Sequence, residues 1–155
     1  MHPTRVLLLT VAMIALIVVA ATPAASAAER NPYTAAGVCG PGFEVVKRAP
    51  MFQYGRRLAA TVLTYKRSTR RYCAVTLKRR WIGRPSWTEV YLRREGGPRQ
   101  DHRDYGSFSY YAGPVYNRSA DRCVGWGGNV NQLVRRQGKW WAAYREVSRV
   151  TSGCG

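Results

Sequence analysis

Apolar and polar residues alternate in short runs along most of the chain, and the clearest run is Tyr72–Arg79. One face of this run holds Cys73, Val75 and Leu77, and the other holds the residues at 72, 76 and 78. Because successive side chains of a β-strand point to opposite faces, the alternation predicts a strand. We expect the face that holds Cys73 to lie in the core.

The density of β-branched and aromatic residues predicts six further strands. They cover Phe43–Lys47, Leu58–Tyr65, Trp87–Arg93, Phe108–Tyr116, Cys123–Trp126 and Trp140–Val147. Gly113–Pro114 is expected to bend or interrupt its strand, because proline cannot donate a hydrogen bond to a sheet. The last segment also places four apolar residues on one helical face, and we favour a strand over a short helix. Polar residues predict a turn at 67–70 and an exposed loop at 99–104.

Strands that recur every ten to fifteen residues, with turn residues between them, are typical of antiparallel all-β domains. The pattern predicts β structure from end to end, without a helix or an internal repeat. We therefore expect an all-β fold, either a single antiparallel β-sandwich or a small barrel. Residues 28–155 suit one domain, and a chain of this size can bury a core without help from a metal.

Residues 1–27 have the features of a signal peptide. Arg5 precedes an apolar run, Val6–Ala21, and Ala25-Ser26-Ala27 matches the small-x-small cleavage rule. A retained membrane anchor is the alternative, but a run of about sixteen residues is short for a span of roughly twenty. The mature protein is expected to begin at Ala28 or Glu29 and to be secreted and extracellular, with no transmembrane anchor.

All four cysteines, Cys39, Cys73, Cys123 and Cys154, lie after the predicted cleavage point. An even number in an exported chain predicts two disulfides, and four cysteines allow three pairings. We favour Cys73–Cys123, because Cys73 faces the predicted core and Cys123 opens a strand of similar character. Cys39–Cys154 would then join the two ends of the mature chain. His102 is the one histidine after the cleavage point and no Cys-x-x-Cys pair occurs, so neither a metal site nor a cofactor is expected.

The chain carries 25 basic and 8 acidic residues, for a net charge of +17. Many of the arginines are adjacent: Arg56-Arg57, Arg70-Arg71, Arg79-Arg80, Arg93-Arg94 and Arg135-Arg136. Such a surface attracts polyanions, although the charge would also keep an exported protein soluble. The pairs fall at predicted turns and strand ends, which favours a charge spread over the surface over one dedicated groove. No specific nucleic-acid binding is predicted.

No catalytic motif is present, and no catalytic residue is assigned. His102 lies between Asp101 and Asp104, which resembles a proton relay, but a solvated loop is the better interpretation. Disulfide formation would leave no thiolate nucleophile. The five tryptophans and ten tyrosines, interleaved with arginine, are able to stack on sugars or bases, yet aromatic residues in strands more often form the core.

Trp126 lies among glycines at 125, 127 and 128 and three residues after Cys123. In a regular strand, Cys123 and Trp126 would point to opposite faces. We expect the glycines to permit a bulge that returns the indole to the core beside a Cys73–Cys123 bridge. These glycines would serve backbone shape and close approach, not phosphate binding.

Two segments together form a distinctive motif. It consists of Tyr111, Ala112, Gly113, Pro114, Val115 and Tyr116, followed by Cys123, Trp126, Gly127 and Gly128. This motif resembles the spore-associated protein A family of filamentous, spore-forming bacteria, and supporting matches occur around Cys39, around Cys73 and at the terminal Cys154-Gly155. The resemblance implies a small exported protein associated with spores or aerial growth, and it implies no enzymatic activity and no ligand.

Together these observations predict a secreted, non-catalytic protein of the spore or cell surface. Its expected partner is an anionic spore-wall or cell-surface polymer. The alternative is a cationic extracellular binder or antagonist that acts on wall polymer, nucleic acid, membrane or a protease. Release by moderate salt would indicate attachment through charge.

Overall fold

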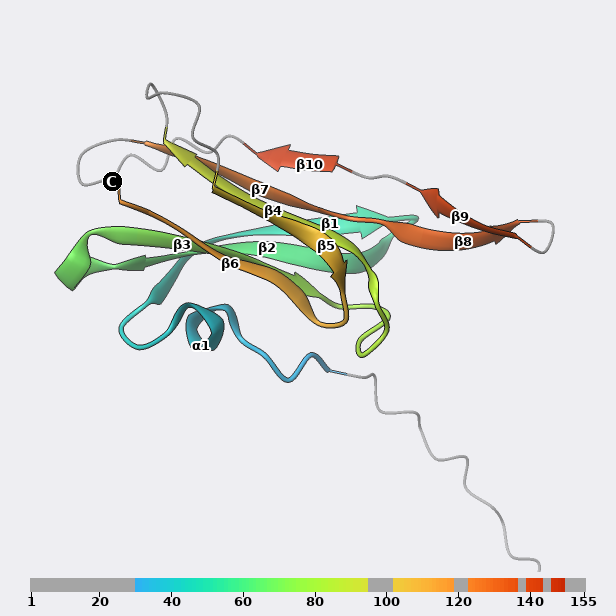
Figure 1. Cartoon of the computed structure of the whole chain (residues 1–155), viewed down its shortest axis with the longest axis horizontal. Coiled ribbons are helices and arrows are strands. Elements are labelled where there is room, and N and C mark those ends of the chain that lie inside the picture. The colour runs from blue at the N-terminus through green and yellow to red at the C-terminus, as the bar shows by residue number, and fades with distance from the viewer. Residues whose placement is uncertain (1–29, 95–101, 119–122, 137–138, 144–145, 150–155) are drawn as a thin grey trace, which may run out of the picture.

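The computed structural model describes residues 30–94, 102–118, 123–136, 139–143 and 146–149, and within them two four-stranded antiparallel sheets form a β-sandwich (Figure 1). Sheet 1 has the order β1-β2-β3-β6, with β1 Glu44–Gln53, β2 Arg56–Lys66, β3 Arg71–Lys78 and β6 Tyr111–Arg118. Sheet 2 has the order β10-β7-β4-β5, with β4 Ser86–Arg94, β5 His102–Phe108, β7 Val124–Val130 and β10 Glu146–Arg149. A separate hairpin pairs β8, Gln132–Arg136, with β9, Lys139–Ala143. The predicted all-β antiparallel fold is confirmed, and of the two architectures expected, sandwich or small barrel, the two sheets form the sandwich.

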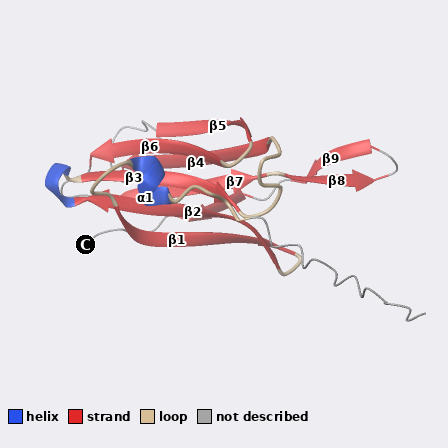
Figure 2. Ribbon diagram, turned by 90° about the horizontal axis from the view of Figure 1, so that it is seen from below, coloured by secondary structure: helices blue, strands red, loops and turns tan. Residues whose placement is uncertain are grey.

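A short helix, α1 (Ala35–Cys39), covers the outer face of sheet 1 (Figure 2). The side-chain oxygen of Thr34 caps it by accepting a hydrogen bond of 3.1 Å from the backbone N–H of Gly37. The prediction of β structure from end to end is therefore wrong at this point. Five residues are too few to show a helical repeat of apolar positions. The local sign of a helix in the sequence is Thr34, a residue type that favours the N-cap position.

β3 is buried on both of its faces. Cys73, Val75 and Leu77 pack against α1, which confirms that this face belongs to the core. The opposite face, with Ala74 and Lys78, points toward sheet 2 and is buried as well. A central strand that lies between a helix and a second sheet has no face left for solvent.

The structure joins Cys39 to Cys73, so the predicted pairings Cys73–Cys123 and Cys39–Cys154 are wrong. The physical reason is the direction of Cys73, which faces α1, where Cys39 lies, and not sheet 2, where β7 follows Cys123. Cys123 is itself disulfide-bonded. Cys154, the fourth cysteine, lies outside the described residues.

β6 contains a bulge at Gly113–Pro114, as the proline predicted. Ala74 of β3 pairs with Val115 and Thr76 with Ala112, so β6 uses one residue more than its neighbour. The extra residue changes which side chains share a face. Ala112 and Val115, three residues apart, therefore both lie in the core between the sheets.

Several element boundaries differ from the prediction. The single strand expected at 108–116 is two strands, because β5 ends at Phe108 and β6 begins at Tyr111. The loop expected at 99–104 is wrong for 102–104, which begin β5, while 99–101 lie outside the described residues. The strand expected at 140–147 is divided between β9 and β10, which confirms strand over helix.

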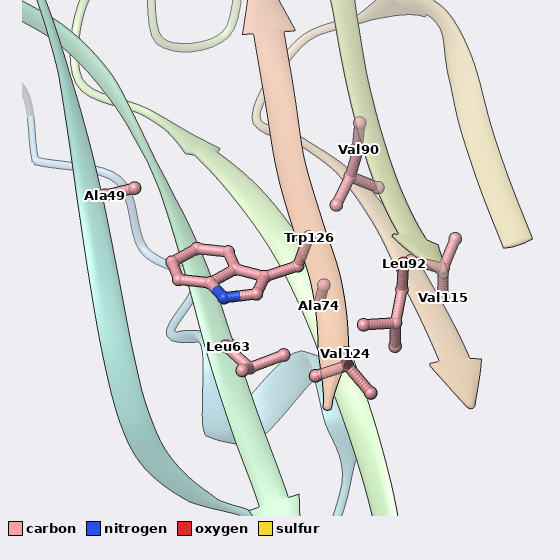
Figure 3. Close-up of a cluster of buried hydrophobic side chains, with 9 residues drawn as sticks. Ala49, Leu63, Ala74, Val90, Leu92, Val115, Val124 and Trp126 are labelled. Atoms are coloured by element: carbon pink, nitrogen blue, oxygen red, sulfur yellow. The ribbon is translucent and has the colours of Figure 1, made fainter. Parts of the chain in front are cut away.

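The core between the sheets is built around Trp126 of β7, whose side chain is 1% exposed. Figure 3 shows the indole directed across the sandwich toward Ala49 and Leu63, with Ala74 beside it. Small residues on sheet 1 leave the space that the large indole fills. Val124 of the same strand joins the cluster from the neighbouring inward position.

Trp126 reaches this core without a bulge. β7 pairs with β4 in unbroken register from Val124 to Val130, so the expected bulge is wrong although the burial is confirmed. Cys123 precedes the regular strand, and its orientation does not constrain the tryptophan. Val124, Trp126 and Gly128 alternate regularly onto the inner face.

At Gly128 the backbone of β7 lies close against side chains of sheet 1. A Cβ atom there would lie 2.6 Å from Thr61 Oγ1, and closer still to Thr76 Oγ1 and the carbonyl oxygen of Glu89. The two threonine hydroxyls are buried and bond to each other at 2.9 Å. Glycine is therefore required because neighbouring atoms leave no room for a side chain.

Replacing Trp126 with alanine is expected to lower the free energy of unfolding by about 3–5 kcal/mol, because it empties the largest side chain from the core. Trp87→Ala is the matched control, since Trp87 on adjacent β4 is 42% exposed. The control should cost about 1 kcal/mol or less. Urea unfolding of both variants provides the measurement, and equal losses would contradict this account of the core.

Candidate functional site

A pocket of about 320 Å³ lies beside the turn that joins β5 to β6. It is lined by Tyr33, Phe108, Ser109, Tyr110, Tyr111 and Gly113. The N-terminal segment that precedes α1 contributes Tyr33, and the end of β5, the turn and the start of β6 contribute the rest. The volume lies at the small end of the range for ligand sites.

The three carbonyl groups of the turn all accept hydrogen bonds from outside it. The oxygen of Phe108 accepts from Lys78 Nζ at 3.1 Å, and that of Ser109 accepts from the backbone N–H of Gly83 at 3.1 Å. The oxygen of Tyr110 accepts from the backbone N–H of Lys78 at 3.0 Å. These bonds hold the turn, and with it one side of the pocket, in a fixed position.

Asn31 fixes the other side of the pocket. Its side-chain nitrogen donates to the carbonyl oxygens of Tyr110, at 2.8 Å, and Lys78, at 3.1 Å. Its side-chain oxygen accepts from the backbone N–H of Tyr33 at 3.0 Å. The ring of Tyr33 then meets those of Tyr110 and Tyr111 edge-on, with centroids 5.3 and 4.9 Å apart. The ring of Tyr33 therefore meets both neighbouring rings at a steep angle.

Lys78 is the buried support behind the pocket, and its side chain has no exposed surface. Its ammonium group donates to the carbonyl oxygens of Arg84, at 2.5 Å, and Phe108, at 3.1 Å. No carboxylate pairs with it among the residues that the structure describes. Burial away from water lowers the pKa of Lys78 from 10.5 to about 8.

Gly113 connects the pocket to β5. Its backbone N–H donates to Asp104 Oδ2 at 2.7 Å, and its φ of +105° lies in the region that favours glycine. A Cβ atom here would lie 2.9 Å from the carbonyl oxygen of Ala74. The carboxylate of Asp104 therefore binds the backbone of β6. Asp101, His102 and Asp104 do not form a proton relay in the described residues: His102 is exposed at the start of β5, and Asp101 lies outside them.

The family-motif residues occupy two places in the fold. In β6, Tyr111 and Gly113 line the pocket, Ala112 and Val115 enter the core, Pro114 is exposed and Tyr116 packs toward α1. Cys123, Trp126, Gly127 and Gly128 belong to β7 or immediately precede it, in the other sheet. The hydroxyl of Tyr116 donates to the carbonyl oxygen of Cys39 at 3.0 Å, which ties β6 to the end of α1. The two halves of the motif therefore lie in different sheets.

Strand pairing gathers arginines at the two ends of sheet 1. The pocket-end arginines are Arg56, Arg57, Arg79 and Arg80, and the far-end arginines are Arg67, Arg70, Arg71 and Arg118. Arg79 donates its backbone N–H to Leu58 at 2.8 Å, which brings the end of β3 beside the start of β2. Arg71 and Arg118 are direct partners across β3 and β6. Adjacent pairs were visible in the sequence, but their gathering depends on the register.

Acidic partners for these arginines are scarce. Within the described parts of the chain, one ion pair is present, between Arg103 Nε and Glu89 Oε1 at 3.0 Å. Both clusters are therefore available to an external anion. In those same parts no group of three or more histidine, cysteine or acidic side chains is placed to hold a metal ion. No helix there has the length and apolar character needed to cross a bilayer.

The aromatic residues divide between core and surface. Trp126 is buried, as expected, and Trp81 packs beside a smaller apolar cluster. Trp87 and Tyr105 are exposed on the outer face of sheet 2, with ring centroids 5.6 Å apart. Sequence reasoning did not identify Tyr33 or Phe108 as pocket residues, because their approach depends on the hydrogen bonds of Asn31 and Lys78.

Comparison with known proteins finds a relative named Spore-associated protein A, from Streptomyces coelicolor (strain ATCC BAA-471 / A3(2) / M145). The two sequences are 37% identical over 119 residues, which cover 76% of this chain and 71% of the relative. No family profile matches the chain. No solved structure matches it either.

The buried amine predicts how stability depends on pH. Because the folded pKa of Lys78 is lowered, its contribution is complete above the unfolded value of 10.5 and is lost as pH falls through about 8. The free energy of unfolding should gain about 2 kcal/mol from this group between about pH 7 and about pH 9.5.

Lys78→Met should lose this gain, because methionine does not titrate, whereas Lys66→Met on the neighbouring strand should retain it. Urea unfolding at several pH values measures the slope for each protein. A Lys78→Met slope equal to that of the wild type would contradict the assignment.

Proposed function

The chain belongs to the spore-associated protein A family, and we propose that it is a secreted, non-catalytic protein held at the spore surface by anionic wall polymer. The relative's name supports association with spores. The apolar run and cleavage sequence at residues 1–27 support export. The observation that carries the proposed attachment is the gathering of arginines at both ends of sheet 1, with few acidic partners.

The far-end arginines strengthen this argument. Like charges placed directly opposite each other on neighbouring strands lower the stability of a sheet, and Arg71 lies opposite Arg118. The guanidinium of Arg71 also lies over the ring of Tyr116, 4.7 Å from its centroid. A polyanion bound at this end would relieve the repulsion, which gives the arrangement a use beyond solubility.

Attachment through a charged surface differs from attachment through one groove in the number of independent contacts. The two clusters lie at opposite ends of sheet 1, so one polymer segment need not contact both. Each cluster should then contribute separately to binding. The relative's name favours this role over the alternative of a cationic antagonist of outside targets.

Purified spore walls provide the test. Wild-type protein should bind them at low salt, and its affinity should fall at least about tenfold between about 0.05 M and about 0.3 M salt, because salt screens the arginines. Vegetative walls, assayed in parallel, show whether the spore surface is preferred. Binding that is unchanged across this salt range would contradict attachment through charge.

Two matched triple variants test the role of the clusters. Arg56, Arg79 and Arg80 are changed to glutamine in one, and Arg67, Arg70 and Arg118 in the other, which leaves the ring-stacked Arg57 and Arg71 intact. Each variant should weaken binding about fivefold or more, and lysine in place of glutamine should largely restore it. A full effect from one cluster and none from the other would indicate a single site instead.

A further inference from the structure

We propose that the pocket beside the turn between β5 and β6 binds a neutral sugar ring of the wall polymer, while the pocket-end arginines bind acidic groups of the same polymer. This inference rests on the proposed function. It adds a site of defined shape to an attachment that would otherwise depend on charge alone.

The chemistry of the lining favours a sugar. Four of the six lining residues are aromatic, three of these are tyrosines with hydroxyl groups, and Ser109 adds another hydroxyl. Among the described residues that line the pocket, none has a charged side chain. A pyranose ring has an apolar C–H face and an edge of hydroxyl groups, so it matches aromatic faces and polar atoms together.

The geometry of the rings favours a puckered ring over a nucleic-acid base. The ring of Tyr33 is inclined by 64° to that of Tyr110 and by 66° to that of Tyr111. A flat base stacks best on parallel aromatic faces that follow one another along a strand. Tyr33 has no parallel partner in either neighbour, so the pocket offers aromatic faces at different angles, which suits a compact ring with hydroxyl groups at its edge.

The pocket is organised before any ligand binds. Hydrogen bonds from Asn31, Lys78 and Gly83 occupy the carbonyl groups of the turn, and Asn31 also holds the backbone of Tyr33. Because the ordering cost has been met during folding, little of the binding free energy is lost to fixing the loop. The occupied carbonyl groups also leave the tyrosine and serine hydroxyls as the polar groups for the ligand.

Positive charge lies next to the pocket. Lys78 ends β3 and bonds to Tyr110 of the lining, and Arg79 and Arg80 follow it directly in the chain. Gly83 bonds to Ser109, and the exposed Arg84 follows it. A polymer that alternates neutral sugars with acidic groups would therefore contact aromatic residues and arginines at one end of the molecule.

Uncharged trisaccharides of glucose and of N-acetylglucosamine are the probes, titrated into the ¹⁵N-labelled protein at about 0.5 M salt, where arginine contacts are screened. At least one should shift the amide signals of residues 108–113. Tyr33→Ala should weaken this binding about tenfold, because an aromatic ring of the lining is lost. Tyr105→Ala, which removes an exposed tyrosine outside the pocket, should change it less than about twofold.

Tyr33→Phe separates stacking from hydrogen bonding and guards against a folding defect, since it keeps the ring and should bind better than Tyr33→Ala.

Absence of shifts at 108–113 with both sugars would overturn the pocket assignment, and salt-sensitive wall binding would still stand. Binding lost in Tyr105→Ala but not in Tyr33→Ala would place the sugar on the outer face of sheet 2. Shifts at 108–113 caused by single-stranded DNA and not by either sugar would also overturn the sugar assignment. Sugar binding without wall binding at low salt would support the pocket and refute attachment through charge.

Discussion

The close contact of the two sheets at Gly128 is the constraint on which the rest of the structure depends. The backbone of β7 approaches the hydrogen-bonded pair of Thr61 and Thr76 so closely that no side chain fits between them. Two residues away, Trp126 fills the wider space left by alanines of sheet 1. A large side chain at Trp126 and no side chain at Gly128 thus set how closely the two sheets pack along β7.

The geometry of the candidate pocket depends on this contact. Lys78 is the last residue of β3 and, two residues beyond Thr76, points to the same inner face. Its amine donates to the carbonyl oxygen of Phe108 at the end of β5 in the other sheet. The separation of the sheets therefore determines where the turn between β5 and β6 lies. The same register of sheet 1 gathers arginines at the pocket end, so core packing, pocket and surface charge are consequences of one arrangement.

The sequence predicted most of the strands and the antiparallel sandwich, because period-two alternation is a local property that survives in the fold. It failed where a neighbour in space decides the outcome. Lys78 is polar by type but buried, since sheet 2 covers it. The sequence favours a Cys73–Cys123 bridge, because no pattern in the residues around Cys73 indicates that α1 brings Cys39 to it. Tyr33 of the pocket lies far along the chain from Tyr111, and hydrogen bonds of Asn31 help to hold Tyr33 beside it.

Adding a single methyl group to Gly128 tests the central contact most directly. Gly128→Ala should lower the free energy of unfolding by about 3 kcal/mol, because the new Cβ meets backbone and buried threonine oxygens that have no space to move. Gly125→Ala on the same strand is the matched control, since its Cβ meets only the flexible side chain of Arg93 and should cost less than about 1 kcal/mol. Equal stability of the two variants in urea unfolding would contradict the claim that the sheets are fixed at Gly128.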